Sequence, residues 1–312
     1  MKLQKVICLG FNGKELEEKY WQELDEQVES RILLSSEEEI NNQTEADGLF
    51  VKLGAKVGRE LIDKLPNLKY IGMLGTGYGG IDTNYAASKG VTVTNIADYA
   101  TEAVAEFTFG ILLEYLRSIS KARTQAKAED YTDNFNGSEI KGKKIGVIGL
   151  GDIGKRTAQL AQAFSAEVVY WSRNRKPEFE AAGVTYCELD ELLASSDIVT
   201  LNLALNNETE GIINAERINK LKSGAIFINP SPMELIDFAA LCNRLVKKDM
   251  VFMLDHSDEM TSQQLNTLQP LNNAIIYPAI AYLTEEAGQL KKRIYVDNLK
   301  NFLNGRPTNK VN

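Results

Sequence analysis

Histidine is almost missing from this sequence, because its 312 residues contain a single one, His256. One imidazole excludes metal sites built from several histidines and any reaction scheme that needs two imidazoles. Cysteine is scarce too. Cys8, Cys187 and Cys242 are too few and too far apart in sequence for a disulfide framework or a zinc site. We therefore expect no bound metal and a reducing, cytoplasmic location.

Long apolar runs are absent as well, since no stretch approaches the roughly 18 apolar residues that a membrane helix needs. The start, MKLQKVICLGF, lacks a long apolar region and a cleavage site, so we expect a first strand there and not a signal peptide. With 43 acidic against 35 basic residues the net charge is −8, which argues against nucleic acid as a partner. A small-molecule substrate is the remaining expectation, and the length predicts about two domains.

The chain from Lys141 onward alternates short apolar runs with helical segments. Continuous apolar strands separated by amphipathic helices are typical of a parallel sheet covered on both faces. The sequence therefore predicts an α/β fold with a doubly wound Rossmann domain. The first hundred residues predict a smaller α/β unit, and one long helix near residues 101–130 is expected to join the two. The Rossmann strands are expected at residues 143–149, 167–172, 184–187, 197–203, 225–230, 250–255 and 274–280.

A glycine-rich segment, Gly149-Leu150-Gly151-Asp152-Ile153-Gly154, fits the pattern G-x-G-x-x-G between a predicted strand and a predicted helix. Gly149 permits a tight turn, Gly151 lets a pyrophosphate approach the backbone, and Gly154 lets the helix pack against the strand. The helix N-terminus adds unpaired N–H groups and a positive dipole end. We expect a nicotinamide dinucleotide to bind at Gly149, Gly151, Asp152, Ile153 and Gly154. A glycine-rich turn without a ligand is the alternative.

The end of the second Rossmann strand usually decides between NAD and NADP, because a carboxylate there binds the adenosine ribose and repels a 2′-phosphate. This chain has no carboxylate at that place, where Ser172 is followed by Arg173, Asn174, Arg175 and Lys176. A hydroxyl and arginines suit a phosphate through charge-assisted hydrogen bonds. We therefore expect Ser172, Arg173, Arg175 and Lys176 to favour NADP over NAD. A solvated loop that does not distinguish the two nucleotides is the alternative.

Longer stretches carry a family resemblance. They include LPNLKYIGMLGTGYGGID, VTVTNIADYATEAVAEFTFGILL, KKIGVIGLGDIG and DIVTLNLALNNETEGIINAERINKLKSGAIFIN. In order and spacing, over about residues 46–307, the chain resembles the D-isomer-specific 2-hydroxyacid dehydrogenases. The resemblance implies a flavodoxin-like substrate domain of residues 1–98 and 285–312, and an NAD(P)-binding Rossmann domain of residues 99–284. It also implies a cleft between the domains and a homodimer built around the long helix.

Catalysis in that family needs an arginine that holds the substrate carboxylate, a histidine that donates a proton and a glutamate that orients the histidine. The resemblance assigns the arginine position to Pro232, the glutamate position to Met260 and the histidine position to Ala279. Glu259 lies one position from the glutamate slot. Because proline and alanine can neither bind a carboxylate nor donate a proton, we do not expect ordinary reduction of a 2-keto acid.

Other residues that the resemblance places at the cleft could replace the lost groups. Lys52 matches a position that often carries arginine, and it could pair with a substrate acid. Tyr282 could donate a proton or only fill the space of the missing imidazole, and His256, directly after Asp255, could take part in proton transfer. A solvated strand-end lysine and a structural histidine are the alternatives, and Tyr99 is expected only to line the cleft.

The remaining family positions that hold cofactor or substrate are intact in this chain. By resemblance, the cofactor side includes Thr101, Asn202, Leu203, Ala204, Pro230 and Asp255. The substrate side includes Leu53, Gly54, Gly75, Thr76 and Gly77.

Three functional interpretations remain open. We favour a divergent NAD(P)-dependent oxidoreductase that reduces a non-standard carbonyl, imine or alkene, because hydride transfer can depend mainly on positioning. A catalytically inactive NADP(H)-binding sensor would keep the nucleotide site alone. A 2-hydroxyacid dehydrogenase that uses displaced residues is the third interpretation.

Overall fold

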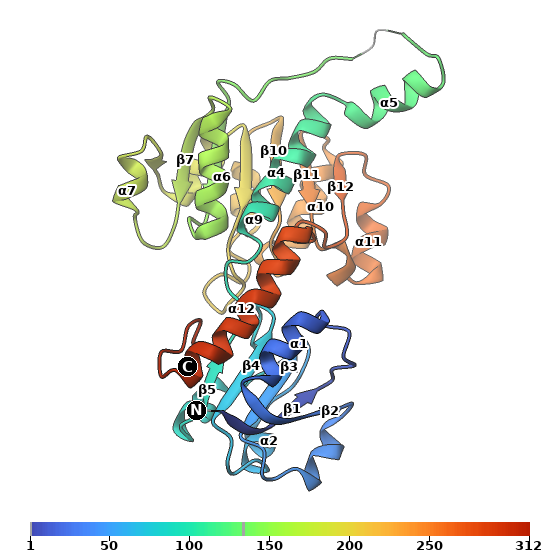
Figure 1. The fold of residues 1–312 in the computed structure, drawn as a ribbon. Helices are drawn as coiled ribbons and strands as arrows, with labels where there is room; N and C mark the ends of the chain where they lie inside the picture. The colour runs from blue at the N-terminus through green and yellow to red at the C-terminus, as the bar shows by residue number, and fades with distance from the viewer. Residues whose placement is uncertain (1, 133–134) are drawn as a thin grey trace. The chain divides into compact units, whose positions relative to one another are not determined.

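The computed structural model describes residues 2–132 and 135–312, except for the side chain of residue 42. It divides the chain into two compact units, Met1–Tyr99 with Glu285–Asn312, and Ala100–Thr284 (Figure 1). Within the described residues the strands form one sheet of five and one of seven, and all neighbouring strands are parallel. The predicted α/β class with two parallel sheets is confirmed.

The first unit carries the smaller sheet, whose strand order is β2-β1-β3-β4-β5. This is the flavodoxin-like order, which reverses direction between β1 and β3. The elements of this unit are β1 (Leu3–Leu9), α1 (Glu18–Asp25), β2 (Val28–Leu34), η1 (Glu37–Asn42), β3 (Gly48–Lys52), α2 (Arg59–Asp63), β4 (Tyr70–Leu74), α3 (Thr83–Ser88), β5 (Thr92–Thr94) and α12 (Glu285–Leu303).

The C-terminal helix α12 packs within this first unit. The centroid of its buried Tyr295 ring lies 5.3 Å from that of Phe50 in β3. Arg293 and Lys300 of α12 both contact the carboxylate of Glu23 in α1, at 2.7 and 2.6 Å. Apolar packing and ion pairs thus fix α12 to the smaller sheet and to α1.

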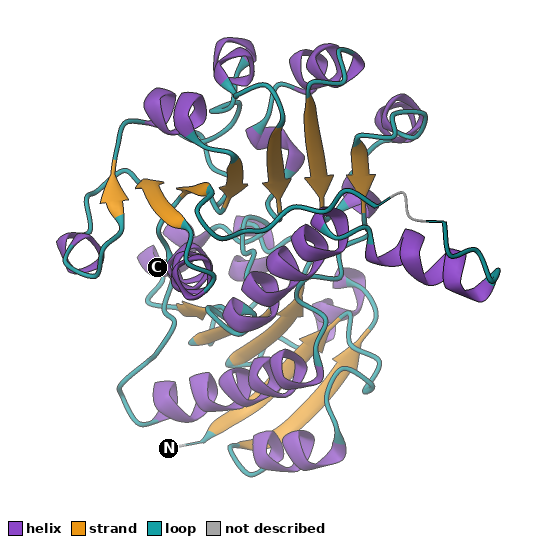
Figure 2. Cartoon of the chain, turned by 90° about the horizontal axis from the view of Figure 1, so that it is seen from above, coloured by secondary structure: helices purple, strands orange, loops and turns teal. Residues whose placement is uncertain are grey.

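The second unit carries the larger sheet, ordered β12-β11-β10-β9-β6-β7-β8, with helices on both of its faces (Figure 2). The chain enters at β6, winds outward to β8, then returns to β9 and winds outward to β12. Its direction reverses between β6 and β9, and folds of this kind bind ligands outside the carboxyl ends of the strands at such a point. The elements are α4 (Thr101–Leu116), α5 (Ile119–Lys127), β6 (Lys144–Ile148), α6 (Asp152–Ala163), β7 (Glu167–Trp171), α7 (Pro177–Glu180), β8 (Thr185–Tyr186), α8 (Leu189–Ser195), β9 (Ile198–Leu201), α9 (Ala215–Lys220), β10 (Ala225–Asn229), η2 (Met233–Leu235), α10 (Phe238–Val246), β11 (Met250–Leu254), η3 (Ser257–Glu259), α11 (Ser262–Leu268) and β12 (Ala274–Ile276).

The prediction of one continuous helix near residues 101–130 is wrong. Helix α4 ends at Leu116, and α5 is a separate helix. Ser118 between them has a φ of 49°, in the left-handed region that a right-handed helix cannot contain. Buried residues continue along α4 as far as Leu116 and α5 buries none, so the apolar periodicity supports a helix only as far as Leu116.

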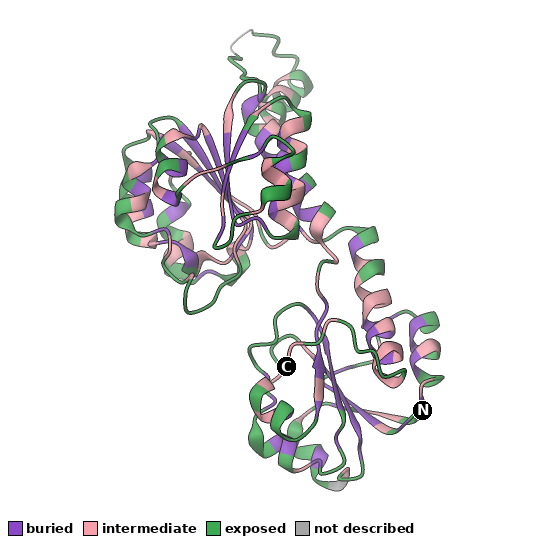
Figure 3. Cartoon of the chain, turned by 90° about the vertical axis from the view of Figure 1, so that its left-hand side faces the viewer, coloured by how far each residue is buried: buried purple, intermediate pink, exposed green. Residues whose placement is uncertain are grey.

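Buried side chains are concentrated on the strands and on the inner faces of the helices (Figure 3). In the larger sheet, the neighbouring Phe227 and Phe252 are both fully buried. Burial on both faces accounts for the continuous apolar runs of the sequence. No helix in the described ranges has the length and hydropathy that crossing a membrane requires.

Candidate functional site

A tight turn joins β6 to α6 at the reversal point of the larger sheet. Gly149 has a φ of 90°, which glycine tolerates best, and its amide donates to the carbonyl of Trp171 at 2.8 Å. A Cβ at Gly154 would lie 1.9 Å from the Gly149 carbonyl oxygen, so helix and turn are in contact there. A Cβ at Gly151 would meet no atom within 4 Å. This open space at the N-terminus of the 12-residue α6 fits a dinucleotide pyrophosphate.

Polar atoms surround this turn. Asp152, the first residue of α6, has its carboxylate 3.6 Å from Nζ of Lys155, which partly balances its charge. The carbonyl of Ile153 accepts a hydrogen bond from Thr157 inside the helix. Asn202, whose backbone carbonyl lies against Gly149, has a buried Oδ1 without a hydrogen-bond partner among the described residues. That acceptor is available to a donor group of a bound dinucleotide.

A pocket of about 450 Å³ lies next to the turn, where Leu203 contacts both. Apolar side chains form part of its wall, and a few charged groups complete it. Such a lining suits a nucleoside with a charged substituent. We call it the nucleoside pocket, and its lining residues are Trp171, Arg173, Leu203, Ala204, Asn206, Glu208, Thr209, Ile212 and Arg217.

The structure separates the cations that follow β7. Arg173 lines the pocket, whereas Arg175 forms an ion pair with Glu180 in α7. Lys176 precedes α7 as its N-cap residue. The buried hydroxyl of Ser172 donates to a backbone carbonyl two residues further on, at 2.6 Å. Arg173 is therefore the cation of this loop that borders the nucleoside pocket.

A second set of polar groups gathers where β11 ends. Asp255 is 1% exposed and accepts hydrogen bonds from the amides of Ile280 at 3.0 Å and Ala281 at 3.4 Å. Burial raises the pKa of Asp255 above its ordinary value, although these amides oppose the shift. His256 follows with a φ of 75°; its Nε2 lies 3.5 Å from Oδ2 of Asp255 and its Nδ1 lies 3.3 Å from Oε1 of Glu259. The imidazole thus lies between two carboxylates.

The family's arginine, glutamate and histidine positions are occupied by residues that cannot replace them chemically. Met260 is 9% exposed and packs in the apolar core of the second unit, so Glu259 and not Met260 approaches the imidazole. Ala279 is half-buried, and its amide donates to Oδ1 of Asp258 at 2.6 Å. Pro232 precedes the short helix η2. None of these three side chains can hold a carboxylate or transfer a proton.

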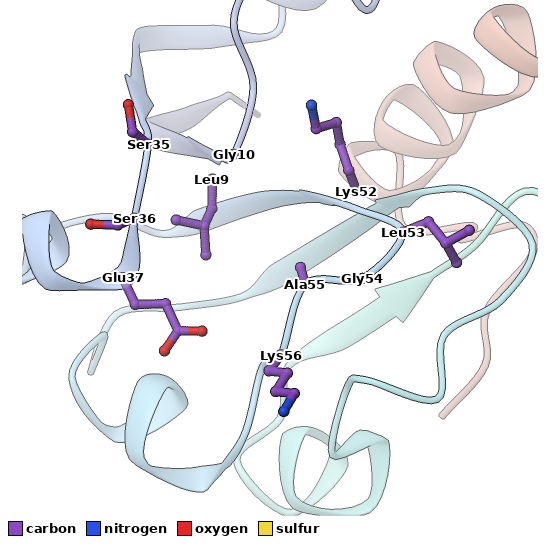
Figure 4. A pocket seen from close by; sticks show the side chains of 10 residues that line it. All are labelled: Leu9, Gly10, Ser35, Ser36, Glu37, Lys52, Leu53, Gly54, Ala55 and Lys56. Atoms are coloured by element: carbon purple, nitrogen blue, oxygen red, sulfur yellow. The ribbon is translucent and has the colours of Figure 1, made fainter. Parts of the chain in front are cut away.

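In the first unit, a pocket of about 390 Å³ lies at the carboxyl ends of β1, β2 and β3 (Figure 4). Nζ of Lys52 lies 2.7 Å from Oε1 of Glu15 and 5.6 Å from the ring centroid of Phe11. Burial opposes the ionisation of Glu15, but hydrogen bonds from Lys52 and from the Asn12 amide outweigh it and lower the pKa of Glu15. Lys52 is therefore a paired cation. The lining residues are Leu9, Gly10, Ser35, Ser36, Glu37, Lys52, Leu53, Gly54, Ala55 and Lys56.

The turn after β4 lies beside Leu53, which belongs to the loop that follows β3. Oγ1 of Thr76 donates to the carbonyl of Ile96 at 2.9 Å, and Nδ2 of Asn95 donates to the carbonyl of Thr76 at 2.8 Å. A Cβ at Gly77 would lie 3.3 Å from Cδ1 of Leu53. The predicted substrate residues thus come together at the carboxyl edge of the smaller sheet. They are Leu53, Gly54, Gly75, Thr76 and Gly77.

The catalytic candidates are divided between the units. His256 and Tyr282 belong to the second unit, and Lys52 and Tyr99 to the first. The ring centroid of Tyr99 lies 5.5 Å from Nζ of Lys291, whose pKa is lowered by burial. Of the other cofactor-side predictions, Thr101 begins α4, Pro230 follows β10, and Leu203 and Ala204 lie in the loop after β9.

Sequence reasoning missed six residues that line the nucleoside pocket, namely Trp171, Asn206, Glu208, Thr209, Ile212 and Arg217. Trp171 directly precedes Ser172 at the end of a predicted strand, so its place was available from the sequence. Arg217 is oriented by Asp190, with Nε 3.0 Å from Oδ1, and that contact joins residues far apart in the chain. Strand order is needed to bring such residues to one pocket.

Comparison with known proteins finds relatives over most of the chain. The model of the family described as D-isomer specific 2-hydroxyacid dehydrogenase, NAD binding domain, matches residues 109–281. A hydroxypyruvate reductase of Blautia hydrogenotrophica is 34% identical over 297 residues, which cover 90% of this chain and 89% of that protein. A glyoxylate reductase of Thermofilum pendens is 33% identical over 280 residues, covering 87% and 82%.

Solved structures of high similarity include two that contain ligands. The D-lactate dehydrogenase of Aquifex aeolicus, complexed with NAD and lactic acid, matches with a TM-score of 0.81 and 27% identity over 96% of each chain. An acyclic imino acid reductase in complex with NADPH and D-arginine matches with a TM-score of 0.84 and 28% identity, over 98% of this chain and 100% of that chain.

Proposed function

The chain belongs to the D-isomer specific 2-hydroxyacid dehydrogenase family, whose members are nicotinamide-dependent oxidoreductases, and we propose that within this family it reduces an imine. One observation carries the proposal. The phosphate turn at Gly151 is open and intact, while the position of the family's proton donor is occupied by Ala279. The nucleotide site is thus kept and the acid–base group is lost.

The chemistry of the acceptor explains why a missing acid can be tolerated. A ketone that receives hydride becomes an alkoxide and needs a proton from the protein. A protonated imine already carries that proton on nitrogen, so hydride on its carbon gives a neutral amine directly. Bound reduced nicotinamide supplies the hydride. The protein then has to orient the acceptor, which is a large part of catalysis by itself.

The charges at the end of β11 support a cationic acceptor. Asp255, Asp258 and Glu259 are three carboxylates within five residues, and one imidazole lies among them. Fixed anionic groups stabilise a cation such as a protonated imine. The structural similarity to an imino acid reductase points to the same class of acceptor.

The proposed cofactor is NADP in preference to NAD. Arg173 borders the nucleoside pocket, and Ser172 stands where a carboxylate would otherwise repel a 2′-phosphate. Arg175 and Lys176 lie outside the lining, so this preference depends on one arginine and is expected to be moderate.

A second candidate is favoured by one contact. His256 and Glu259 form an imidazole–carboxylate pair on one loop, which would allow a 2-hydroxyacid dehydrogenase reaction through displaced residues. Such a protein would reduce 2-keto acids without any amine.

We also propose that the protein is a cytoplasmic homodimer assembled through α4, α5 and residues 128–132. Large apolar side chains are exposed there, with Ile119 at 51% and Tyr131 at 81%. Light scattering during size-exclusion chromatography should give twice the chain mass of 34.7 kDa.

The function is tested by measuring the oxidation of NADPH with the same 2-keto acid in the presence and absence of an amine. Pyruvate and glyoxylate, each with and without methylamine, are matched acceptors, because the amine converts the carbonyl to an imine in solution. We expect turnover with the amine and almost none without it. Amine-independent reduction of glyoxylate at about 10 s⁻¹, an ordinary enzymatic rate, would favour the displaced-residue candidate instead.

A further inference from the structure

The arginine of the nucleoside pocket has a carboxylate partner. Nη1 of Arg173 lies 2.7 Å from Oε2 of Glu208, and both side chains line the same pocket as Trp171. Arg173 follows β7 and Glu208 follows β9, and these two strands flank β6 in the sheet. The pair therefore joins the loops on either side of the strand that leads into the glycine turn.

Hydrogen bonds within the loop fix the backbone of Glu208. Oδ1 of Asn206 accepts from the amides of Glu208 at 2.9 Å and Thr209 at 3.2 Å. Oγ1 of Thr209 donates to the carbonyl of Ala204 at 2.7 Å. The loop is thus preorganised, while the Glu208 side chain stays 70% exposed and can reorient.

From this geometry we infer that Glu208 is a specificity-determining residue, which limits the preference for NADP over NAD. The inference rests on the proposed function. Arg173 is the group placed to bind a 2′-phosphate, and Glu208 competes with that phosphate for the guanidinium and repels it. With NAD, the same carboxylate accepts hydrogen bonds from the ribose hydroxyls. It takes over a role that Ser172 at the end of β7 cannot fill.

How strongly Glu208 lowers the affinity for NADP depends on how exposed the Arg173–Glu208 ion pair is. Arg173 and Glu208 are 76% and 70% exposed, so the ion pair itself is weak and a phosphate can displace the carboxylate. Repulsion between the displaced carboxylate and a doubly charged phosphate several ångströms away remains. In water this repulsion corresponds to roughly a 3- to 10-fold loss of affinity.

Direct binding measurements test this inference without any turnover. Adenosine 2′,5′-bisphosphate and adenosine 5′-monophosphate differ by the 2′-phosphate alone, and NADPH and NADH form the matching full-length pair. Because Trp171 lines the pocket and Trp21 lies in the first unit, a Trp21→Phe background leaves one tryptophan to report binding by fluorescence.

Glu208→Gln should strengthen the binding of adenosine 2′,5′-bisphosphate and of NADPH by roughly 3- to 10-fold, and it should weaken the binding of adenosine 5′-monophosphate and of NADH. Glu210→Gln is the matched control, because it removes the same charge from an exposed residue of the same loop. The double variant Arg173→Gln/Glu208→Gln should lose the gain for NADPH. A gain that persists in the double variant would overturn the specific role of the pair.

The remaining outcomes separate this inference from the function it rests on. Equal affinities in Glu208→Gln and Glu210→Gln, with nucleotide binding by the parent protein, overturn the role of Glu208 and leave the proposed function standing. Failure of the parent protein to bind any of the four nucleotides overturns both.

Discussion

Nδ1 of His256 lies 3.3 Å from Oε1 of Glu259, three residues later in the loop after β11. A histidine–glutamate pair is therefore present in a protein whose family positions for those residues hold Ala279 and Met260. The other ring nitrogen faces the buried carboxylate of Asp255, at 3.5 Å. Both ring nitrogens thus face carboxylates, and the buried Nδ1 has no hydrogen-bond partner among the described residues. This arrangement fits an electrostatic role for His256 better than proton donation.

The variant His256→Gln separates the two roles. If the acceptor is a protonated imine, kcat/KM should change by less than about 10-fold, because no proton from the imidazole is needed. If a ketone is reduced through His256, the same change should cost about two to four powers of ten. Steady-state kinetics on the amine-dependent and amine-free acceptors, with Glu259→Gln alongside, distinguish these cases. A 1,000-fold loss on imines, about the middle of that range, would show that imine reduction does depend on the imidazole.

The glycine turn gives a prediction with two contrasting variants. Gly151→Val fills the open space in front of α6, so it should weaken NADPH binding by at least about 10-fold and leave the melting temperature close to that of the parent. Gly154→Ala should instead destabilise the second unit by about 1–3 kcal/mol, because its Cβ would lie 1.9 Å from the Gly149 carbonyl oxygen. Tryptophan fluorescence and thermal melting measure the two effects. Unchanged NADPH affinity in Gly151→Val would place the pyrophosphate elsewhere.

The sequence predicted best what depends on neighbouring residues. The α/β alternation and the turn from Gly149 to Gly154 are local patterns, because each strand and its following turn are written in consecutive residues. The left-handed Ser118, which divides the expected long helix, has no such pattern around it. Non-glycine residues adopt a positive φ only occasionally, so a serine gives no indication in the sequence that the helix breaks there.

The sequence could not predict the environment of each candidate side chain, because the residues that surround it are distant in the chain. From the sequence, Lys52 could pair with a substrate acid or be a solvated lysine at the end of a strand. In the structure it pairs with Glu15, which is 37 residues away. Arg173 was grouped with Arg175 because they are close in sequence. They differ because Glu208 and Glu180 approach from different elements. Such pairings depend on strand order and on loop paths.

Lys52 allows a test of the smaller domain. Lys52→Met should raise KM for a carboxylate-bearing acceptor by about 10-fold or more, since an ion pair or charged hydrogen bond is lost, and should leave NADPH affinity unchanged. Glu15→Gln removes the competing carboxylate and should lower KM. Lys64→Met, a partly exposed lysine in the same unit, is the matched control. Equal kinetics in Lys52→Met and Lys64→Met would assign Lys52 a structural role with Glu15.

The ion pairs between α1 and α12 predict how the stability of the first unit depends on pH. Hydrogen bonds from Arg293 and Lys300 lower the pKa of Glu23 from 4.5 to about 2. Because the folded pKa is depressed, the carboxylate stabilises the folded state above pH 4.5, and this contribution disappears as the pH falls toward about 2. The pair is partly exposed, so solvent screening limits the effect to about 1 kcal/mol. At neutral pH, Glu23→Gln should lower the free energy of unfolding of the first unit by that amount.

The free energy of unfolding of the first unit is measured by urea unfolding, followed by the fluorescence of Trp21, which is buried on α1. A Trp171→Phe background removes the other tryptophan. The difference between the parent and Glu23→Gln should shrink steadily between pH 4.5 and about 2, because the parent then loses the charge that the variant never had. Glu26→Gln, at an exposed position at the end of the same helix, controls for the loss of one negative charge. A deficit of the same size at neutral and acidic pH would mean that Glu23 acts through packing and not through its charge.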